Sequence, residues 1–308
     1  MIRTTAIFLA ALGVAGCATE DIPFLADNEG AVADAGVQAP LAEADDLGDF
    51  PEVKDGTTIT FDGGATYTGE IKDGKQNGKG TYTSPDGFVY TGDWKDGLFD
   101  GRGQAAYPDG STYRGDFSAG KPDGEGSITY ADGSTYTGDW AAGAISGQGV
   151  STRPDGYRYE GAWVDGVQQG EARITYPDGA AYEGTVADGK SDGAGTLTLP
   201  SGFSYTGAFV DGIITGDGAA TYANGDRYEG SFVGGERQGE GTATYSDGST
   251  YTGSFADGVR SGQGMYKRAD GFTYEGEWQN GQINGTGVAV FPNGTRLEGE
   301  FRDGQFVG

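Results

Sequence analysis

Aromatic residues recur at one fixed interval through most of this chain. From Tyr67 onward the pattern returns at every twenty-third position, and no insertion interrupts it. The residues that open the repeats are Tyr67, Tyr90, Tyr113, Tyr136, Tyr159, Tyr182, Tyr205, Tyr228, Tyr251 and Tyr274, and Leu297 takes the same place in a shorter eleventh repeat. A period of this length and fidelity indicates stacked repeats, each of which needs its neighbours to bury its apolar face.

Each repeat has the pattern of a β-hairpin. We number its positions as columns 0 to 22, with the opening Tyr in column 0. Alternation places Tyr, Gly and Trp or Phe of columns 0, 2 and 4 on one face, and polar residues on the other. A second strand-like run begins near the paired glycines of columns 11 and 13 and ends at a Pro-Asp-Gly turn or a variant of it. Gly accounts for 61 of the 308 residues, which disfavours long helices.

The register of the hairpin follows from a compensation between two columns. Column 17 is aromatic in six complete repeats, and in the other four it holds Ser84, Arg153, Leu199 and Arg268. In those four repeats column 21 becomes aromatic, as Phe88, Tyr157, Phe203 and Phe272. Each complete repeat therefore has one aromatic residue in either column 17 or column 21. This compensation indicates that columns 17 and 21 face each other across a three-residue loop. This register predicts a type I turn closed by a left-handed Gly.

The register defines the two faces of the predicted sheet. Columns 0, 2 and 4 share a face with columns 11, 13, 15 and 17, and Thr, Ser, Glu and Asp occupy the other face. Gly beside aromatic residues lets rings lie flat over the neighbouring backbone. We therefore predict an all-β fold, an elongated single-layer antiparallel sheet of about 22 strands built from tandem hairpins.

The composition disfavours most catalytic chemistry. The formal net charge is −26, and the chain has no His and a single Cys. Without His it lacks the commonest general base and metal ligand, and one Cys cannot form a Cys-rich metal site. A polyanion of this size repels nucleic acid and acidic headgroups. We predict no enzymatic activity, no cofactor, no metal and no nucleic-acid partner.

Acidic residues also recur in the predicted turns, at Asp86, Asp109, Asp132 and Asp155. Calcium motifs place several oxygen ligands within one loop, whereas each of these loops offers one carboxylate. Asp before Gly is ordinary turn chemistry, because its side chain bonds its own backbone. We favour the turn interpretation over calcium.

The N-terminus has the pattern of a secretion signal. Arg3 precedes a largely apolar run from Ala6 to Val14, which is shorter than the ~20 residues of a transmembrane helix. The run from Leu12 to Cys17 resembles the bacterial lipobox, in which small residues precede a Cys that is acylated and becomes the mature N-terminus. We predict a signal peptide over residues 1–16 and lipidation of Cys17. The alternative is an ordinary signal peptide with an incidental Cys.

Residues 17–56 are expected to form a disordered acidic tether, because they are rich in Ala, Asp, Glu, Gly and Pro and lack apolar periodicity. The repeat array is expected over residues 57–308. Ala18 follows Cys17 where the inner-membrane retention signal of enterobacteria has Asp. This predicts a lipid-anchored protein of the bacterial cell envelope, at the outer membrane and facing the periplasm.

The repeated motif is similar to that of MORN (membrane occupation and recognition nexus) repeats, Tyr-x-Gly-x-Trp-x-x-Gly-x-x-x-Gly-x-Gly. Ten full copies run from Tyr67 to Arg296, after a partial repeat at Thr57–Thr66 and before a truncated one. Departures from the motif are Ile71, Ala172, Val186 and Leu297. The resemblance implies a scaffold that holds a partner or a second copy along an aromatic groove.

MORN arrays are also linked to acidic phospholipids. The only tight basic group here is Lys72, Lys75 and Lys79, and Asp73 interrupts it, so we do not expect the repeats to bind such lipids.

We predict an envelope scaffold that binds a protein partner, or itself as a homodimer, along the aromatic face of the sheet. The alternative is a glycan- or peptidoglycan-binding envelope protein that uses the same face. The residues expected to contact the partner are Tyr90, Trp94, Tyr113, Phe117, Tyr136, Trp140, Tyr159, Trp163, Tyr274 and Trp278.

Overall fold

The computed structural model describes residues 56–308. The predictions for the signal peptide over residues 1–16, for Cys17 and for the tether up to residue 55 therefore lie outside the described residues. Strands are the only regular elements from Gly56 to Gly308, and this part of the chain has no helix long and apolar enough to span a bilayer.

The described residues form 23 strands of one open antiparallel sheet, which confirms the predicted all-β fold. β1 (Thr57–Thr60) precedes the first complete repeat. The first strands of the repeats are β2 (Thr66–Lys72), β4 (Val89–Lys95), β6 (Thr112–Ser118), β8 (Thr135–Ala141), β10 (Arg158–Val164), β12 (Ala181–Ala187), β14 (Ser204–Val210), β16 (Arg227–Val233), β18 (Thr250–Ala256), β20 (Thr273–Gln279) and β22 (Arg296–Arg302). The second strands are β3 (Lys75–Thr83), β5 (Leu98–Ala106), β7 (Lys121–Thr129), β9 (Ala144–Thr152), β11 (Val167–Thr175), β13 (Lys190–Thr198), β15 (Ile213–Thr221), β17 (Glu236–Thr244), β19 (Val259–Lys267), β21 (Gln282–Val290) and β23 (Gln305–Phe306).

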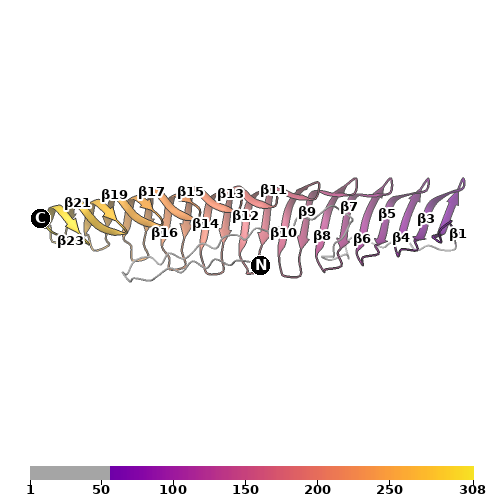
Figure 1. Cartoon of the computed structure of the whole chain (residues 1–308), viewed down its shortest axis with the longest axis horizontal. Coiled ribbons are helices and arrows are strands. Elements are labelled where there is room, and N and C mark those ends of the chain that lie inside the picture. Colours follow the sequence, from indigo (N-terminus) through magenta and orange to yellow (C-terminus); the bar gives the residue numbers. More distant parts are fainter. Residues whose placement is uncertain (1–55) are drawn as a thin grey trace. The chain divides into compact units, whose positions relative to one another are not determined.

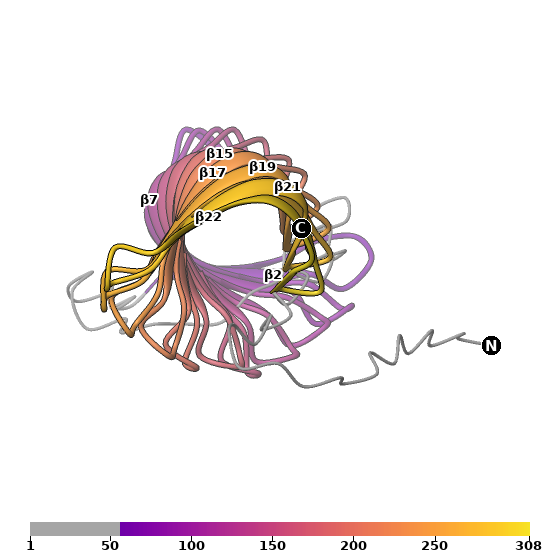
Figure 2. The same ribbon diagram turned by 90° about the vertical axis from the view of Figure 1, so that its left-hand side faces the viewer.

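The chain divides into two compact parts, each described by itself. The first holds β1 to β15 together with residues 229–235, and the second holds residues 224–228 and 236–308, with β17 to β23. Inside each part, strands that follow one another in the sequence lie side by side and pair antiparallel (Figure 1). The strands are strongly curved (Figure 2).

The three-residue loops confirm the predicted register. Ser84 of column 17 donates its N–H to the carbonyl of Phe88 in column 21 at 2.8 Å, and Gly87 donates to the Ser84 carbonyl at 3.0 Å. Gly87 has a φ of 100°, which residues with a side chain rarely adopt. The glycine of the Pro-Asp-Gly loop is therefore required by the backbone.

The sequence reading misses a second turn in each repeat. The two-residue loop Asp73-Gly74 joins Lys72 to Lys75, which stand opposite each other. Both loop residues have positive φ, 49° and 77°, as in the type I′ turn that matches the twist of the strands. Second strands therefore begin in column 8, and not near the glycines of columns 11 and 13 as expected. An Asp-Gly dipeptide between strand-like runs is the signal for this hairpin.

The type I′ turns also connect neighbouring repeats. The turn glycine Gly97 donates its N–H to the carbonyl of Gln76 in the preceding repeat at 3.0 Å. Gly120 makes the same bond to Phe99 at 2.9 Å. From the second complete repeat onward, each turn is thus held by the repeat before it as well as by its own strands.

A β-bulge separates the two ends of each hairpin. Gly69 stands opposite Gly80, whereas Ile71 stands opposite Gln76, so the second strand carries two extra residues. An even number of extra residues keeps the alternation of faces in phase. Column 9, which was absent from the predicted core face, therefore also faces the core and buries Ile145 and Ile214.

The tyrosines of column 0 form the centre of the core. In all ten complete repeats this side chain is at most 1% exposed. The ring of Trp94 in column 4 contacts its own Tyr90 edge-on, with 5.4 Å between centroids, and Tyr67 of the preceding repeat at 5.1 Å. Edge-to-face contacts of this kind contribute about 0.5–1.5 kcal/mol each beyond the burial of area. Where column 4 is aromatic, these contacts link a repeat to the one before it.

Candidate interaction surface

In most repeats the core Tyr lies across a pair of glycines. A Cβ atom on Gly149 would lie 2.4 Å from ring and hydroxyl atoms of Tyr136, so the close approach of this ring requires Gly at that position. The repeat of Tyr159 differs, because Ala172 stands opposite Gly161 there. The Tyr136 hydroxyl donates to the carbonyl of Asp139 in the bulge at 2.9 Å. The same bond recurs in other repeats of both compact parts. The prediction that Gly lets rings lie flat over the backbone is confirmed.

The ten aromatic residues predicted to contact a partner are core residues. Their side chains are at most 6% exposed. Several are also held by polar bonds, since the indole N–H of Trp94 donates to the Gly80 carbonyl at 3.0 Å. Rings buried to this extent offer little surface on which a ligand could stack. The buried residues are Tyr90, Trp94, Tyr113, Phe117, Tyr136, Trp140, Tyr159, Trp163, Tyr274 and Trp278.

Several partly exposed aromatic side chains of the first compact part lie beside the three-residue loops, in columns 17 and 21, while Tyr82 and Phe99 are partly exposed in columns 15 and 9. We call the partly exposed rings beside the loops of the complete repeats the aromatic rim, which consists of Phe88, Tyr107, Tyr130, Tyr176 and Tyr222. Phe88 of column 21 packs against Tyr107 of column 17 in the next repeat, with 5.4 Å between ring centroids. Partial burial raises the pKa of Tyr107, Tyr130 and Tyr176 to about 12. These three hydroxyls stay neutral at physiological pH. Ring contacts hold Phe88 against Tyr107, and Tyr176 and Tyr222 against buried rings of their neighbours.

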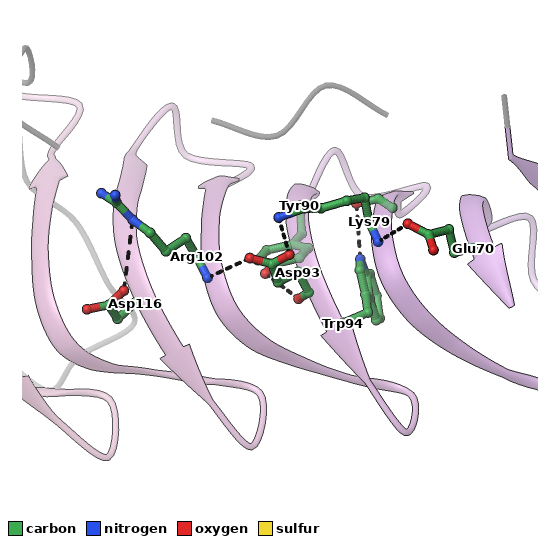
Figure 3. A network of polar contacts seen from close by, with 8 residues as sticks. Glu70, Lys79, Tyr90, Asp93, Trp94, Arg102 and Asp116 are labelled. Atoms are coloured by element: carbon green, nitrogen blue, oxygen red, sulfur yellow. Dashed lines mark hydrogen bonds and ion pairs between the residues drawn. The ribbon is translucent and has the colours of Figure 1, made fainter. Parts of the chain in front are cut away.

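The opposite face carries ordered polar contacts. Asp93 accepts the backbone N–H of Arg102 in the bulge at 3.1 Å and forms an ion pair with Lys79 of the preceding repeat (Figure 3). Glu70 accepts the N–H of Lys79 at 2.9 Å, and Arg102 reaches Asp116 at 4.0 Å. Exposed ion pairs contribute little to stability. The main effect of these carboxylates is to satisfy N–H groups that the bulge removes from the strand ladder.

The turn acids are used in a similar way. Asp132 accepts the N–H of Ser134 at 2.8 Å, and this bond holds the pKa of Asp132 below its usual range. Asp155 accepts the N–H of Tyr157 at 2.9 Å. These bonds favour the turn interpretation over calcium. Within residues 56–308, no group of three or more Asp, Glu, His or Cys side chains is placed to hold a metal ion.

Sequence reasoning also missed an apolar edge beside the type I′ turns. Val164 and Val167 flank one turn, and Val210 and Ile213 flank another. Val164, Val167 and Val210 are 55%, 42% and 52% exposed. Apolar residues in columns 5 and 8, which alternation assigns to the polar face, are the signal that would have found this edge.

No curated protein matches this sequence. One similar solved structure is the TCP domain of SAS-4 (dCPAP) from Drosophila melanogaster in complex with a proline-rich motif of Ana2 (dSTIL). It is 12% identical to this chain, and the match covers 62% of this chain and 94% of that chain at a TM-score of 0.32. The TCP10 domain of CPAP from Danio rerio is 16% identical, with 79% and 98% covered and a TM-score of 0.28. A streptogramin B lyase is 8% identical, with 80% and 83% covered and a TM-score of 0.14. Likenesses at these TM-scores carry no functional argument.

The MORN repeat family matches ten segments of the chain. They are residues 67–89, 90–112, 113–135, 136–156, 159–181, 182–203, 205–227, 228–250, 251–273 and 274–296. Each segment begins with the buried Tyr of column 0, and each contains one hairpin with a type I′ turn. Together the segments span more than half of the chain, so the protein belongs to the MORN-repeat family.

Proposed function

We propose that this chain is a non-catalytic scaffold of the bacterial cell envelope that binds a protein partner along the aromatic rim. Lipidation of Cys17 would attach it to the membrane. The observation that carries the proposal is the recurrence of partly exposed rings beside loops whose backbone is fixed by hydrogen bonds, as at Tyr107, whose N–H bonds the Ser111 carbonyl at 2.8 Å. The charge of −26 favours a protein partner over nucleic acid or an anionic lipid surface.

The geometry of the rim suits a partner that makes several contacts at once. Successive loops are two strands apart, which is roughly 9.6 Å at the usual strand spacing. Tyr and Phe supply a large contact area with few rotatable bonds, and their neighbours already hold these rings. Several modest contacts along one surface add up to stable binding, and rings that are already held lose little side-chain entropy on association.

Truncation of rim residues tests this proposal. The variant Tyr107→Ala/Tyr130→Ala is used as bait for protein partners in envelope extract, and the partner recovered with the wild-type chain is then titrated against each variant. Truncation of an aromatic hot spot costs about 2 kcal/mol or more, so we expect affinity to fall by about 30-fold or more.

The matched control is Thr175→Ala/Thr198→Ala, which changes two exposed side chains on the opposite face of the same compact part. Circular dichroism establishes that each variant is folded. If the rim variant keeps the partner, or the control loses it, the rim is not the binding surface. Retention of the wild-type chain on purified cell wall, with no protein recovered from extract, would instead favour the glycan- or peptidoglycan-binding alternative.

A further inference from the structure

The aromatic face of the second compact part carries a positive excess, although the part as a whole is acidic. This part contains eleven acidic and seven cationic side chains. Only one of the acids, Asp226 in column 21, stands in a column that faces the core, whereas three of the cations do. These are Arg237 and Arg260 in column 9 and Arg268 in column 17. The other acidic side chains of this part lie on the polar face and in the turns.

Column 9 lies beside the three-residue loop of the preceding repeat, because the strands are strongly curved (Figure 2). In the first compact part, Phe99 of column 9 contacts Phe88 of column 21 in the preceding repeat, with 6.0 Å between ring centroids. In the second, the guanidinium of Arg260 lies 6.0 Å from the ring centroid of Tyr245, in column 17 of the preceding repeat. A side chain in column 9 therefore meets the residues beside that loop.

The guanidinium of Arg260 is held in place on the aromatic face. It lies 4.4 Å from the ring centroid of Trp278 and 5.5 Å from that of Tyr266. Its Nη2 donates to the Gly281 carbonyl at 2.8 Å. Arg260, Tyr245 and Tyr266 are all partly exposed, so a ligand can reach this group. A planar guanidinium that its neighbours already orient loses little freedom when it binds.

Arg260 lacks the carboxylate partner that other arginines of this part have. Three of these are ion-paired, Arg268 with Asp270, Arg296 with Glu298 and Arg302 with Glu300. Within residues 56–308, Arg260 forms no ion pair, and the Gly281 carbonyl is the acceptor for its guanidinium. A guanidinium has five N–H donors and no acceptor, so most of its binding capacity is unused here.

The preceding repeat accounts for the missing partner. Column 21 holds Asp226 in the repeat before Arg237, but Ser249 in the repeat before Arg260. Both side chains of column 21 are buried, with 5% and 1% exposed. The same position thus carries a carboxylate in one repeat and a hydroxyl in the next. A partly buried cation without a counter-ion gains from a carboxylate that is supplied from outside the chain.

We propose that Arg260 binds a carboxylate of an acidic segment of another protein, with the rings of Tyr245 and Tyr266 beside it. Arg binds a carboxylate through two parallel hydrogen bonds, and Arg and Tyr are enriched where partners bind most strongly. The positive excess of this face attracts an acidic segment, whereas the polar face repels it. The inference goes beyond the proposed function, because the site lies in the second compact part and does not use the aromatic rim.

A labelled hexa-glutamate peptide is the probe for this site, and its binding to the full chain is followed by fluorescence anisotropy. A hexa-glutamine peptide is the uncharged match. The variant Arg260→Ile removes the guanidinium, and it should fold because Ile214 and Ile283 occupy the same column. We expect the wild-type chain to prefer hexa-glutamate by about 10-fold or more, and Arg260→Ile to lose about 10-fold or more in affinity for it.

Two further variants separate the site from general electrostatics, since each makes the chain more negative by one charge, as Arg260→Ile does. Arg296→Thr acts on the polar face, and Thr holds its column in the two preceding repeats. It should bind hexa-glutamate within about twofold of the wild type. Ser249→Asp copies Asp226 in the repeat before, and its internal carboxylate should weaken the peptide as much as Arg260→Ile does. Hydrogen exchange in β19 and β20 checks that each variant is folded.

Four results would each overturn the proposal. They are equal binding of the two peptides or of neither, full affinity in folded Arg260→Ile, an equal loss in Arg296→Thr, and full affinity in folded Ser249→Asp. The rim variant Tyr107→Ala/Tyr130→Ala should keep the peptide, so failure of this site and failure of the rim are distinguishable.

Discussion

Removal of one core hydroxyl measures how strongly the tyrosines of column 0 hold the bulge. In Tyr136→Phe the ring stays in place, but the hydrogen bond to the Asp139 carbonyl is lost. Tyr136 is 1% exposed and the bond is 2.9 Å long, so water does not readily replace the hydroxyl. A neutral hydrogen bond contributes about 1 kcal/mol net, and a buried acceptor left without a donor costs about 1–3 kcal/mol. We expect a loss of about 1–2 kcal/mol.

Hydrogen exchange is the suitable assay, because long repeat arrays do not always unfold in two states. A loss of about 1–2 kcal/mol corresponds to local opening of β8 and β9 that is roughly 5–30 times more frequent. The control is Tyr130→Phe, which removes the same hydroxyl from a half-buried ring of the aromatic rim. If exchange in β8 and β9 changes less than about twofold, or equally in both variants, the bond does not hold the bulge.

Two further predictions rest on the structure, and a third rests on the sequence around Cys17. Ala142 has a φ of 52° in its type I′ turn, so Ala142→Asn should stabilise the β8–β9 hairpin by about 0.5–1 kcal/mol in hydrogen exchange, whereas Ala141→Asn in the adjoining strand should not. The pKa of Tyr107, Tyr130 and Tyr176 is raised from 10.0 to about 12. Their contribution to the free energy of unfolding should therefore be full below pH 10 and decline as the pH rises towards 12. Tyrosinate absorbance that shows these three residues titrating near 10 would contradict this. Cys17→Ser should abolish acylation and release the protein from the membrane fraction, as intact mass and fractionation will show, and a variant that is still acylated and membrane-bound would refute the lipidation of Cys17.

The hairpin register was predictable because it depends on neighbouring residues. Ser84 and Phe88 lie on either side of one loop, and Gly87 has the backbone conformation that the loop requires. The type I′ turn was equally local, and Asp73-Gly74 marks it in the sequence. It was missed because the strands were assigned from the aromatic columns, which placed the start of the second strand at the paired glycines of columns 11 and 13.

The burial of the predicted contact residues could not be read from alternation alone. The rings were expected to form the core with their inner atoms and to leave their outer faces exposed, because no second layer covers a single sheet. In the structure the ring of Trp94 leans over Tyr67 of the preceding repeat, with 5.1 Å between centroids, so that neighbouring repeats cover each other. That inclination depends on the glycines of columns 2 and 13, on the bulge and on side chains of column 9. The sequence shows these features separately and does not show how they fit together.

The hydrogen bond between a type I′ turn and the repeat before it has a consequence for how repeats can be gained or lost from such a chain. Gly97 bonds the carbonyl of Gln76, less than one full repeat earlier, and within each compact part strands pair with their sequence neighbours. The contact order is therefore low, and folding depends on local contacts. Duplication or loss of a whole repeat leaves every group with a partner of the same kind. Insertion of one residue in a strand would turn its core columns towards solvent. Arrays of this design are therefore expected to grow or shrink only by whole repeats.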